Sequence, residues 1–164
     1  MQYTCSYSSP LGEMLIASDG SAVTGLWFIG QKYFGSTLET EYAEKSLPVF
    51  GQTVRWLDDY FQGNVPMEMP PVSFNSSSFR IRVWKLLMEI PYGHTVTYGE
   101  IARTLEKQTG RRICAQAVGG AVGHNPVSII VPCHRVIGSN GLTGYAGGLD
   151  KKLALLRLEG VNVH

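Results

Sequence analysis

Residues 64–78 show neither helical nor strand periodicity, and they divide the chain into two halves with different hydrophobic patterns. The stretch is rich in Pro, Asn, Met and Ser, which is typical of a linker. Before it, apolar residues occur in short runs separated by turns, whereas after it they recur at helical spacing. With 164 residues the chain can form two small domains. We therefore expect an α+β protein with domains at residues 1–75 and 76–164.

The first 30 residues predict a small antiparallel sheet. Runs at residues 2–7, 13–18 and 23–29 contain apolar, aromatic or β-branched side chains, and two turns rich in Ser, Pro, Gly and Asp separate them. Strands joined by such short turns pair with their neighbours in the sequence. The prediction is a three-stranded antiparallel sheet.

Two helices are expected between the sheet and the linker. Ser36 and Glu39 have the spacing of a capping box, which predicts a short acidic helix over residues 36–44. Pro48 suits the first turn of a second helix, because the missing N–H of proline has no partner there. The apolar spacing that follows extends this helix to Gly63.

The second half is mainly helical. Residues 79–90 follow helical spacing, and Thr97 with Glu100 has the spacing of a second capping box. The helix that starts there is joined by a short Gly-containing turn to another at residues 113–122, which predicts a helix-turn-helix. A last helix is expected over residues 150–160.

The helix at residues 113–122 is unusual because it consists largely of Ala and Gly. Each glycine inside a helix costs about 1 kcal/mol relative to alanine, so this helix must lie close against another surface. Two interpretations remain open, which are packing against a second helix and entry into a groove of DNA.

Charge is unevenly distributed. The first half has three Lys or Arg against eight Asp or Glu, a net charge of −5, and the second half has eleven against five, a net charge of +6. A basic half suggests a polyanionic partner, although chance clustering of solvated charge gives the same pattern. The apolar run at residues 127–132 is far shorter than the roughly 20 residues of a membrane span. Without a signal-peptide pattern, we expect a cytoplasmic protein that does not bind membranes.

Three cysteines, Cys5, Cys114 and Cys133, do not suggest a disulfide framework, and we expect reduced thiols. Cys5 has no Cys or His near it in the first half, so no zinc site is expected. Cys114 is expected to pack toward the core. The tryptophans are expected in the core, and three histidines at the surface or at helix ends: Trp27, Trp56, Trp84, His94, His124 and His164.

The run Pro-Cys-His-Arg-Val at residues 132–136 suggests chemistry. A thiol reacts as its thiolate, so Cys133 needs a base such as His134, and a cation such as Arg135 favours the anion. The base in turn needs an orienting group, a role that Glu159 can fill if the fold brings it close. Taken alone, the run also fits a cysteine that only packs in the core.

Further motifs accompany this run in a fixed order. They are Pro91-Tyr92-Gly93, Thr97-Tyr98-Gly99, Ala117-Val118-Gly119-Gly120-Ala121, Asn125-Pro126, Gly144-Tyr145-Ala146-Gly147-Gly148 and Leu158-Glu159-Gly160. Together with Ser9-Pro10-Leu11-Gly12 and Gly25-Leu26-Trp27-Phe28 they cover essentially the whole chain. The chain resembles the methylated-DNA–protein-cysteine methyltransferases, the 6-O-alkylguanine-DNA alkyltransferases. The resemblance implies a ribonuclease-H-like N-terminal domain followed by a helical domain with the helix-turn-helix.

The resemblance also implies catalytic roles. Cys133 corresponds to the acceptor that attacks the alkyl carbon on guanine, and His134 to the base that takes the thiol proton through a water. Glu159 corresponds to the carboxylate that orients this imidazole. Asn125 corresponds to the residue that braces the active-site turn. Tyr98 corresponds to the tyrosine that helps rotate the target nucleotide and protonates the departing guanine.

The implied partner is duplex DNA that contains 6-O-alkylguanine, with methylated thymine left open as a second substrate. The implied protein is a monomer that acts once and needs neither cofactor nor metal. Family members often carry arginine where this chain has Gln116, and Arg111 and Arg112 in a longer turn are expected to recover affinity for phosphates. The expected DNA contacts are Tyr98, Gly99, Arg111, Arg112, Ala115, Gln116, Gly119, Arg135, Ser139 and Tyr145.

Three other functions compete. Alkyltransferase-like proteins bind lesions without repair, but they replace the acceptor cysteine, which is present here as Cys133. A helix-turn-helix regulator whose cysteine senses electrophiles is the second alternative. The third is a thiol hydrolase that uses Cys133 and His134 on acyl substrates, which would also need an oxyanion hole.

Overall fold

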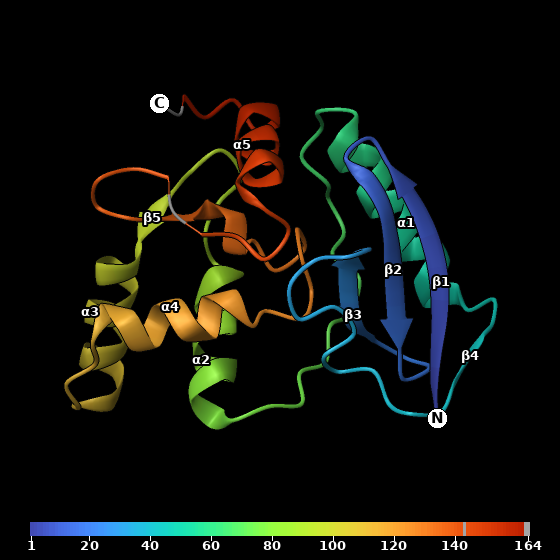
Figure 1. Ribbon diagram of the computed structural model, residues 1–164, viewed down its shortest axis with the longest axis horizontal. Helices are drawn as coiled ribbons and strands as arrows, with labels where there is room; N and C mark the ends of the chain where they lie inside the picture. The colour runs from blue at the N-terminus through green and yellow to red at the C-terminus, as the bar shows by residue number, and fades with distance from the viewer. Residues whose placement is uncertain (143, 163–164) are drawn as a thin grey trace. The chain divides into compact units, whose positions relative to one another are not determined.

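The computed structural model describes residues 1–142 and 144–162, and the chain divides into two compact units (Figure 1). The first unit comprises Met1–Asn75 and Pro126–Ser128, and the second comprises Ser76–Asn125 and Ile129–His164. The expectation for His164 concerns a position outside the described residues. None of the helices in the described part of the chain has both the length and the apolar character of a membrane span.

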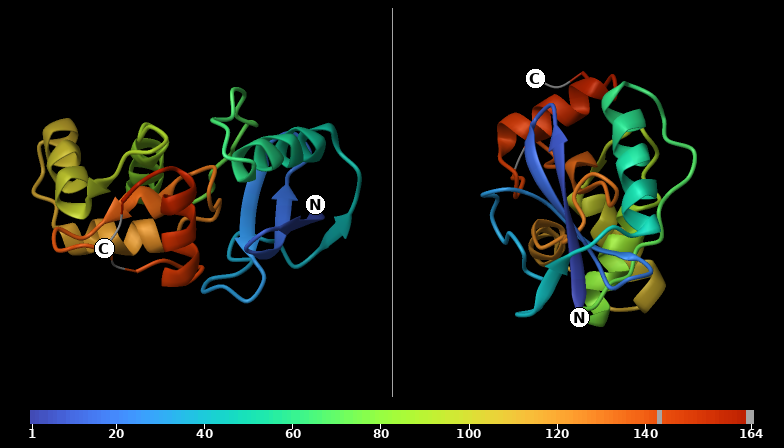
Figure 2. Two further views of the ribbon diagram at one scale, coloured as in Figure 1. Left: turned by 90° about the horizontal axis from the view of Figure 1, so that it is seen from above. Right: turned by 90° about the vertical axis from the view of Figure 1, so that its right-hand side faces the viewer.

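The first unit contains the predicted antiparallel sheet. Strands β1 (Gln2–Ser9), β2 (Gly12–Ser18) and β3 (Val23–Phe28) pair in sequence order, which confirms the prediction. The prediction of three strands is corrected by a fourth, β4 (Tyr42–Glu44), which pairs parallel with the start of β1, so the order is β3-β2-β1-β4. Helix α1 (Pro48–Phe61) lies across one face of this sheet (Figure 2).

The acidic helix predicted over residues 36–44 is wrong. Residues there form turns and then β4. The side chain of Gln2 explains the difference, because its Nε2 donates to the Thr37 carbonyl at 3.1 Å and its Oε1 accepts from the Glu39 amide at 2.7 Å. The Glu39 amide is the group that a Ser36 cap would need as its donor. The side chain of Gln2 accepts from this amide instead.

The core of the first unit lies between the sheet and α1. On the opposite face of the sheet, Trp27 is completely buried beside Phe34, and its ring lies over Gly25, where an added Cβ would stand 2.0 Å from the ring. Helix α1 begins with Pro48 at its N-terminal position, and Gly63 follows its end with φ +88°, as the sequence predicted. The buried face of α1 includes Trp56.

Two segments from outside the sheet pair with β3. The Val23 amide donates to the Pro71 carbonyl at 2.7 Å, so the middle of the predicted linker is fixed to the strand. The Leu26 amide donates to the Pro126 carbonyl at 2.8 Å, and the Ser128 amide donates to the Leu26 carbonyl at 2.9 Å. These bonds explain why residues 126–128 belong to the first unit although they follow most of the second along the chain.

The second unit contains the helix-turn-helix. Thr97 caps α3 (Tyr98–Thr109), and both hydrogen bonds of the predicted capping box with Glu100 are present. Gly110 ends α3 with φ +68°, and the carboxylate of Glu106 accepts from the Ile113 amide at 2.9 Å, which fixes the turn before α4. The remaining elements of this unit are α2 (Ser78–Leu87), β5 (Val96–Thr97), α4 (Ala115–Gly123), η1 (Cys133–Arg135), β6 (Val136–Ile137) and α5 (Leu149–Leu158).

Helix α4 has one buried face and one exposed face. Val118, Ala121 and Val122 are buried, and the indole of Trp84 in α2 donates to the Ala121 carbonyl at 2.8 Å. The exposed face carries only small or uncharged side chains, so it is smooth. Cys114, expected to pack toward the core, is instead exposed at the N-cap of α4. The three tryptophans are buried, as predicted.

Candidate active site

Cys133 begins the short 3-10 helix η1. The Cys133 amide donates to the Val131 carbonyl at 2.8 Å, and the Arg135 amide donates to the Pro132 carbonyl at 3.0 Å. These short-range bonds turn the backbone at Pro132, which has no N–H to continue a ladder. The side chain is recessed, because Cys133 is only 6% exposed.

The loop before η1 is strained and braced. Ile129 has φ +68°, a left-handed conformation that a β-branched residue rarely adopts. The Asn125 side chain donates to the Val131 carbonyl at 2.7 Å across the loop, and it also hydrogen-bonds the side chain of Cys133. Asn125 therefore fixes the loop and touches the candidate nucleophile.

His134 and Glu159 come together although 25 residues separate them. Their Nε2 and Oε2 atoms are 2.6 Å apart, and both side chains are fully buried. Burial alone would raise the pKa of Glu159, but its hydrogen bonds and charge interactions with His134 and Arg135 hold it at about 2. The carboxylate is thus an acceptor, and Nε2 of His134 carries the proton between them.

Burial lowers the pKa of His134 below its ordinary value, even though Glu159 acts to raise it. The charges of Arg135 and Lys152 lower it further. The imidazole is therefore neutral at pH 7, and with Nε2–H directed at Glu159 its Nδ1 is the nitrogen that can take a proton. This is the arrangement of a general base with an orienting carboxylate.

Arg135, which was expected to contact DNA, is buried against Glu159. Its Nε donates to Glu159 Oε1 at 2.8 Å, its Nη2 to Oε2 at 3.2 Å and its Nη1 to the Ile90 carbonyl at 2.7 Å. The guanidinium also lies 5.7 Å from the ring centre of Tyr92, and the residue is 8% exposed. The guanidinium is thus a structural partner of Glu159.

Lys152 is a site residue that the sequence prediction missed. It is fully buried, and its Nζ donates to the carbonyls of Val136 at 2.5 Å and Gly144 at 3.0 Å. Burial lowers its pKa to about 8, against the opposing charge of Cys133. Its spacing from Leu155 and Leu156 could have predicted its burial, because the three residues lie on the same apolar face of α5.

The thiol itself is protonated at rest. Burial raises the pKa of Cys133, and the hydrogen bond from Asn125 and the charge of Lys152 offset only part of this increase. A neutral thiol in a low-dielectric site needs a base before it can react. His134 supplies the base, and Lys152 supplies a cation that favours the thiolate.

Other predicted residues lie on the helix-turn-helix and on the loop after β6. The Tyr98 ring lies beside Gly119, since a Cβ added there would stand 3.9 Å from it, so α3 and α4 bring these two residues together. Gly99 follows Tyr98 in α3 and is half-buried, and Tyr145 is half-buried on the loop. The remaining ones are exposed, namely Arg111, Arg112, Ala115, Gln116 and Ser139.

Comparison with known proteins identifies the family. A family model described as "6-O-methylguanine DNA methyltransferase, DNA binding domain" matches residues 78–161, and one described as the "ribonuclease-like domain" of the same enzyme matches residues 2–70. The methylated-DNA–protein-cysteine methyltransferase of Mycobacterium tuberculosis is 45% identical over 152 residues, which are 92% of this chain and 88% of the relative. This chain belongs to the methylated-DNA–protein-cysteine methyltransferase family.

Further matches agree with this assignment. The methylated-DNA–protein-cysteine methyltransferase of Haemophilus influenzae is 40% identical over 159 residues, 96% of this chain and 86% of the relative. The crystal structure of Mycobacterium tuberculosis OGT in complex with DNA has a TM-score of 0.80 at 42% identity, over 96% of this chain and 91% of that one. The predicted α+β fold is confirmed, and so is the activity of a DNA-repair enzyme that transfers methyl groups from DNA to a protein cysteine.

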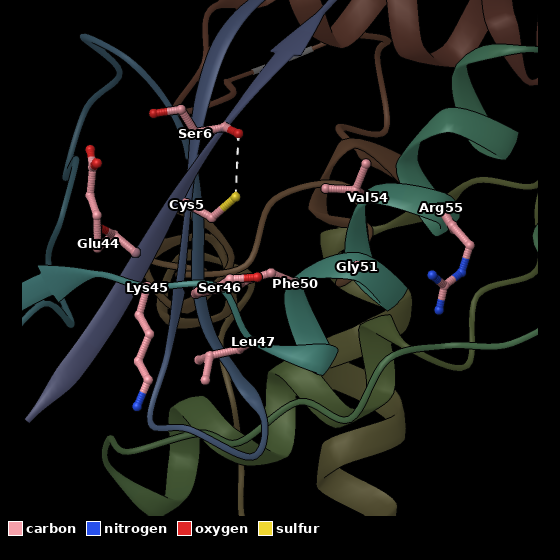
Figure 3. Close-up of a pocket in the computed structure, with 11 residues that line it drawn as sticks. Cys5, Ser6, Glu44, Lys45, Ser46, Leu47, Phe50, Gly51, Val54 and Arg55 are labelled. Atoms are coloured by element: carbon pink, nitrogen blue, oxygen red, sulfur yellow. Dashed lines mark hydrogen bonds between the residues drawn. The ribbon is translucent and has the colours of Figure 1, made fainter.

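The first unit of this methyltransferase contains a pocket that does not include Cys133 or His134. It has a volume of about 800 Å³, lies between β1 and α1, and contains none of the predicted site residues (Figure 3). Cys5 lines it, but burial and the charge of Glu44 raise the pKa of this thiol, and its Sγ donates to the Ser6 carbonyl at 3.5 Å. Within the described residues, no group of three or more His, Cys, Asp or Glu could hold a metal ion.

Proposed function

We propose that this chain repairs duplex DNA by moving the alkyl group of 6-O-alkylguanine onto Cys133, once per molecule. The observation that carries the proposal is a buried thiol followed by a neutral imidazole, which an ionised carboxylate holds at 2.6 Å. Residues 76–164 would bind DNA and perform the transfer, and residues 1–75 would be a structural domain. One chain supplies every residue of this scheme, so a monomer is sufficient.

The proposed reaction is a single displacement. His134 takes the Cys133 proton on Nδ1, through a water where the distance requires one, and the thiolate forms beside Lys152. Sulfur attacks the alkyl carbon in line, the carbon–oxygen bond breaks, and its electron pair stays on the guanine oxygen. Tyr98 protonates the departing guanine and later recovers a proton from solvent. The product is a thioether, which water does not cleave, so the protein does not turn over.

DNA binding would use the smooth face of α4. The target oxygen lies inside the duplex, so the nucleotide must leave the base stack at a cost of a few kcal/mol. The exposed Ala and Gly positions allow α4 to enter the minor groove, with Gln116 hydrogen-bonding the orphaned cytosine. Arg111 and Arg112, both exposed in the turn before α4, would contact phosphates and hold the register. Tyr98, Ser139 and Tyr145 would contact the extruded nucleotide.

The test is the intact mass of the protein after incubation with a duplex that carries one 6-O-methylguanine, followed by peptide mapping. We expect one added methyl group, located on Cys133, with unmodified guanine left in the DNA. Mapping must separate Cys133 from Cys114, which is exposed and offers an accidental acceptor. Unmodified protein that still binds the lesion duplex would contradict the proposal and would indicate a damage sensor. A duplex with 4-O-methylthymine extends the same test to the second substrate.

A further inference from the structure

The carboxylate of Glu159 is held from two sides. His134 contacts Oε2, whereas Arg135 donates to both carboxylate oxygens and the Gly93 amide donates to Oε1 at 3.0 Å. Gly93 has φ +79°, and a Cβ there would stand 3.2 Å from the Glu159 carbonyl oxygen, so only glycine fits this approach. Arg135 is fixed in turn by the Ile90 carbonyl and by the ring of Tyr92.

This arrangement addresses a problem that the His–Glu pair creates. A buried carboxylate 2.6 Å from an imidazole favours the charged imidazolium, and an imidazolium cannot take the thiol proton. The charged or titratable groups around His134 are Cys133 and Arg135 on η1, Lys152 on α5, Glu159 at the C-cap of α5, and Tyr92 on the turn before β5. Glu159 favours protonation of His134, whereas the cations Arg135 and Lys152 oppose it.

Arg135 is bonded directly to the carboxylate of Glu159. Two donors in a planar fork match the two carboxylate oxygens, which fixes both the charge and the orientation of Glu159. Lys152 donates to the backbone carbonyls of Val136 and Gly144.

We propose that Arg135 is a positioning residue, which holds Glu159 as an orienting acceptor and keeps His134 in its neutral, proton-accepting form. The residue acts through Glu159 and touches neither DNA nor the alkyl group. This inference rests on the alkyl transfer proposed above, although its effect on His134 can be measured without any reaction.

The experiment compares wild type with Arg135→Met, Arg135→Lys and the matched control Arg157→Met, which removes an exposed arginine from α5. The first readout is the single-turnover rate of methyl transfer between pH 5.5 and 8.5. The second is the ¹⁵N chemical shift of His134 over the same range in histidine-labelled protein. The third is the affinity for an unmodified duplex and its salt dependence, with circular dichroism as the check for folding.

In Arg135→Met we expect the acid limb of the rate profile to move about one pH unit higher, so that the rate falls by a larger factor at pH 5.5 than at pH 8.5. His134 should titrate at a higher pH in this variant than in wild type, because the Arg135 charge that lowers its pKa is gone. Arg135→Lys should keep most of the wild-type titration, because it retains the charge, and Arg157→Met should match wild type. DNA affinity and the salt slope should not change in either Arg135 variant.

An unchanged His134 titration in Arg135→Met would overturn the proposal, and so would a loss of DNA affinity with a lower salt slope, which would indicate a phosphate contact. If Arg135→Met does not fold, the ¹⁵N shifts and the transfer rate of Arg135→Lys test the proposal. Lysine retains the positive charge but loses the two-pronged contact with the Glu159 carboxylate. A rate loss in Arg135→Lys at all pH values with an unshifted titration supports positioning of Glu159, and a wild-type rate contradicts it. A wild type that transfers no methyl group would refute the proposed function, while the ¹⁵N titration would still test Arg135.

Discussion

Replacing Glu159 by Gln tests the centre of the site with almost no change in volume. The side chain is fully buried, and it bonds His134, Arg135 and the Gly93 amide. Glutamine keeps one acceptor oxygen, but it loses the negative charge that balances Arg135. Its NH₂ group would also face a hydrogen-bond donor of His134, Arg135 or Gly93, where the carboxylate has an acceptor oxygen. A buried arginine without its anion is costly, and breaking such a pair typically costs about 3–5 kcal/mol.

The pKa of Glu159 gives an independent magnitude. A pKa of about 2 in the folded chain, against 4.5 in the unfolded one, corresponds to about 3 kcal/mol of stability at neutral pH. Because the folded pKa is the lower one, this contribution is complete above about pH 5 and is lost as pH falls toward 2. At pH 3 roughly 2 kcal/mol of it is already gone. The difference in unfolding free energy between wild type and Glu159→Gln should therefore shrink from about 3 kcal/mol at pH 7 to about 1 kcal/mol at pH 3.

The assay is urea unfolding of both proteins at pH 7, 5, 4 and 3, with Glu89→Gln as a control for loss of an exposed carboxylate in the same unit. In parallel, single-turnover methyl transfer should slow by about 100-fold or more in Glu159→Gln, because the base is no longer oriented. Affinity for unmodified DNA should stay the same. A stability difference that does not depend on pH would refute the assignment of the charge, and equal transfer rates would refute the relay from Glu159 to His134.

Three further substitutions test the rest of the site. Lys152→Met should raise the pKa of the Cys133 thiol further, seen as slower reaction with a small alkylating reagent below pH 8; unchanged reactivity would contradict its role. The double variant Arg111→Ala with Arg112→Ala should weaken duplex binding and reduce the salt slope by about 2, and an unchanged slope would exclude both as phosphate contacts. Gly119→Ala should stabilise α4 by about 1 kcal/mol and still bind DNA, whereas Gly119→Leu should fold but lose binding at least tenfold, roughly the cost of blocking a close approach. If Gly119→Ala and Gly119→Leu bound DNA equally well, the DNA would not lie against this face of α4.

The two capping boxes show how far local sequence determines structure. Thr97 with Glu100 forms both of its hydrogen bonds, whereas Ser36 with Glu39 forms neither of the predicted ones because Gln2 takes the Glu39 amide. The two motifs look equivalent in sequence. Gln2 lies 37 residues from Glu39, so the outcome depends on the pairing of β1 with β4, which local spacing cannot predict.

The site divides in a similar way. Cys133, His134 and Glu159 could be named from the sequence because their chemistry is evident and the family motif marks them. The burial of Arg135 was not predicted and Lys152 was missed, since a charged side chain is expected at the surface unless it is paired. Only the fold shows that Arg135 has Glu159 as its partner and that Lys152 reaches two backbone carbonyls.

The buried cations Arg135 and Lys152 help to explain how Cys133 avoids reaction with other electrophiles before its single proposed transfer. A thiol with a lowered pKa would react with any small electrophile, and in the proposed reaction each such event would inactivate the protein. Burial of Cys133 does the opposite and keeps the thiol protonated. Reactivity then depends on His134 remaining neutral beside an ionised carboxylate, which requires Arg135, and on a cation near the thiolate, which is Lys152. Selectivity therefore comes from the buried charges around the thiol, and the thiolate forms only as the proton moves to His134.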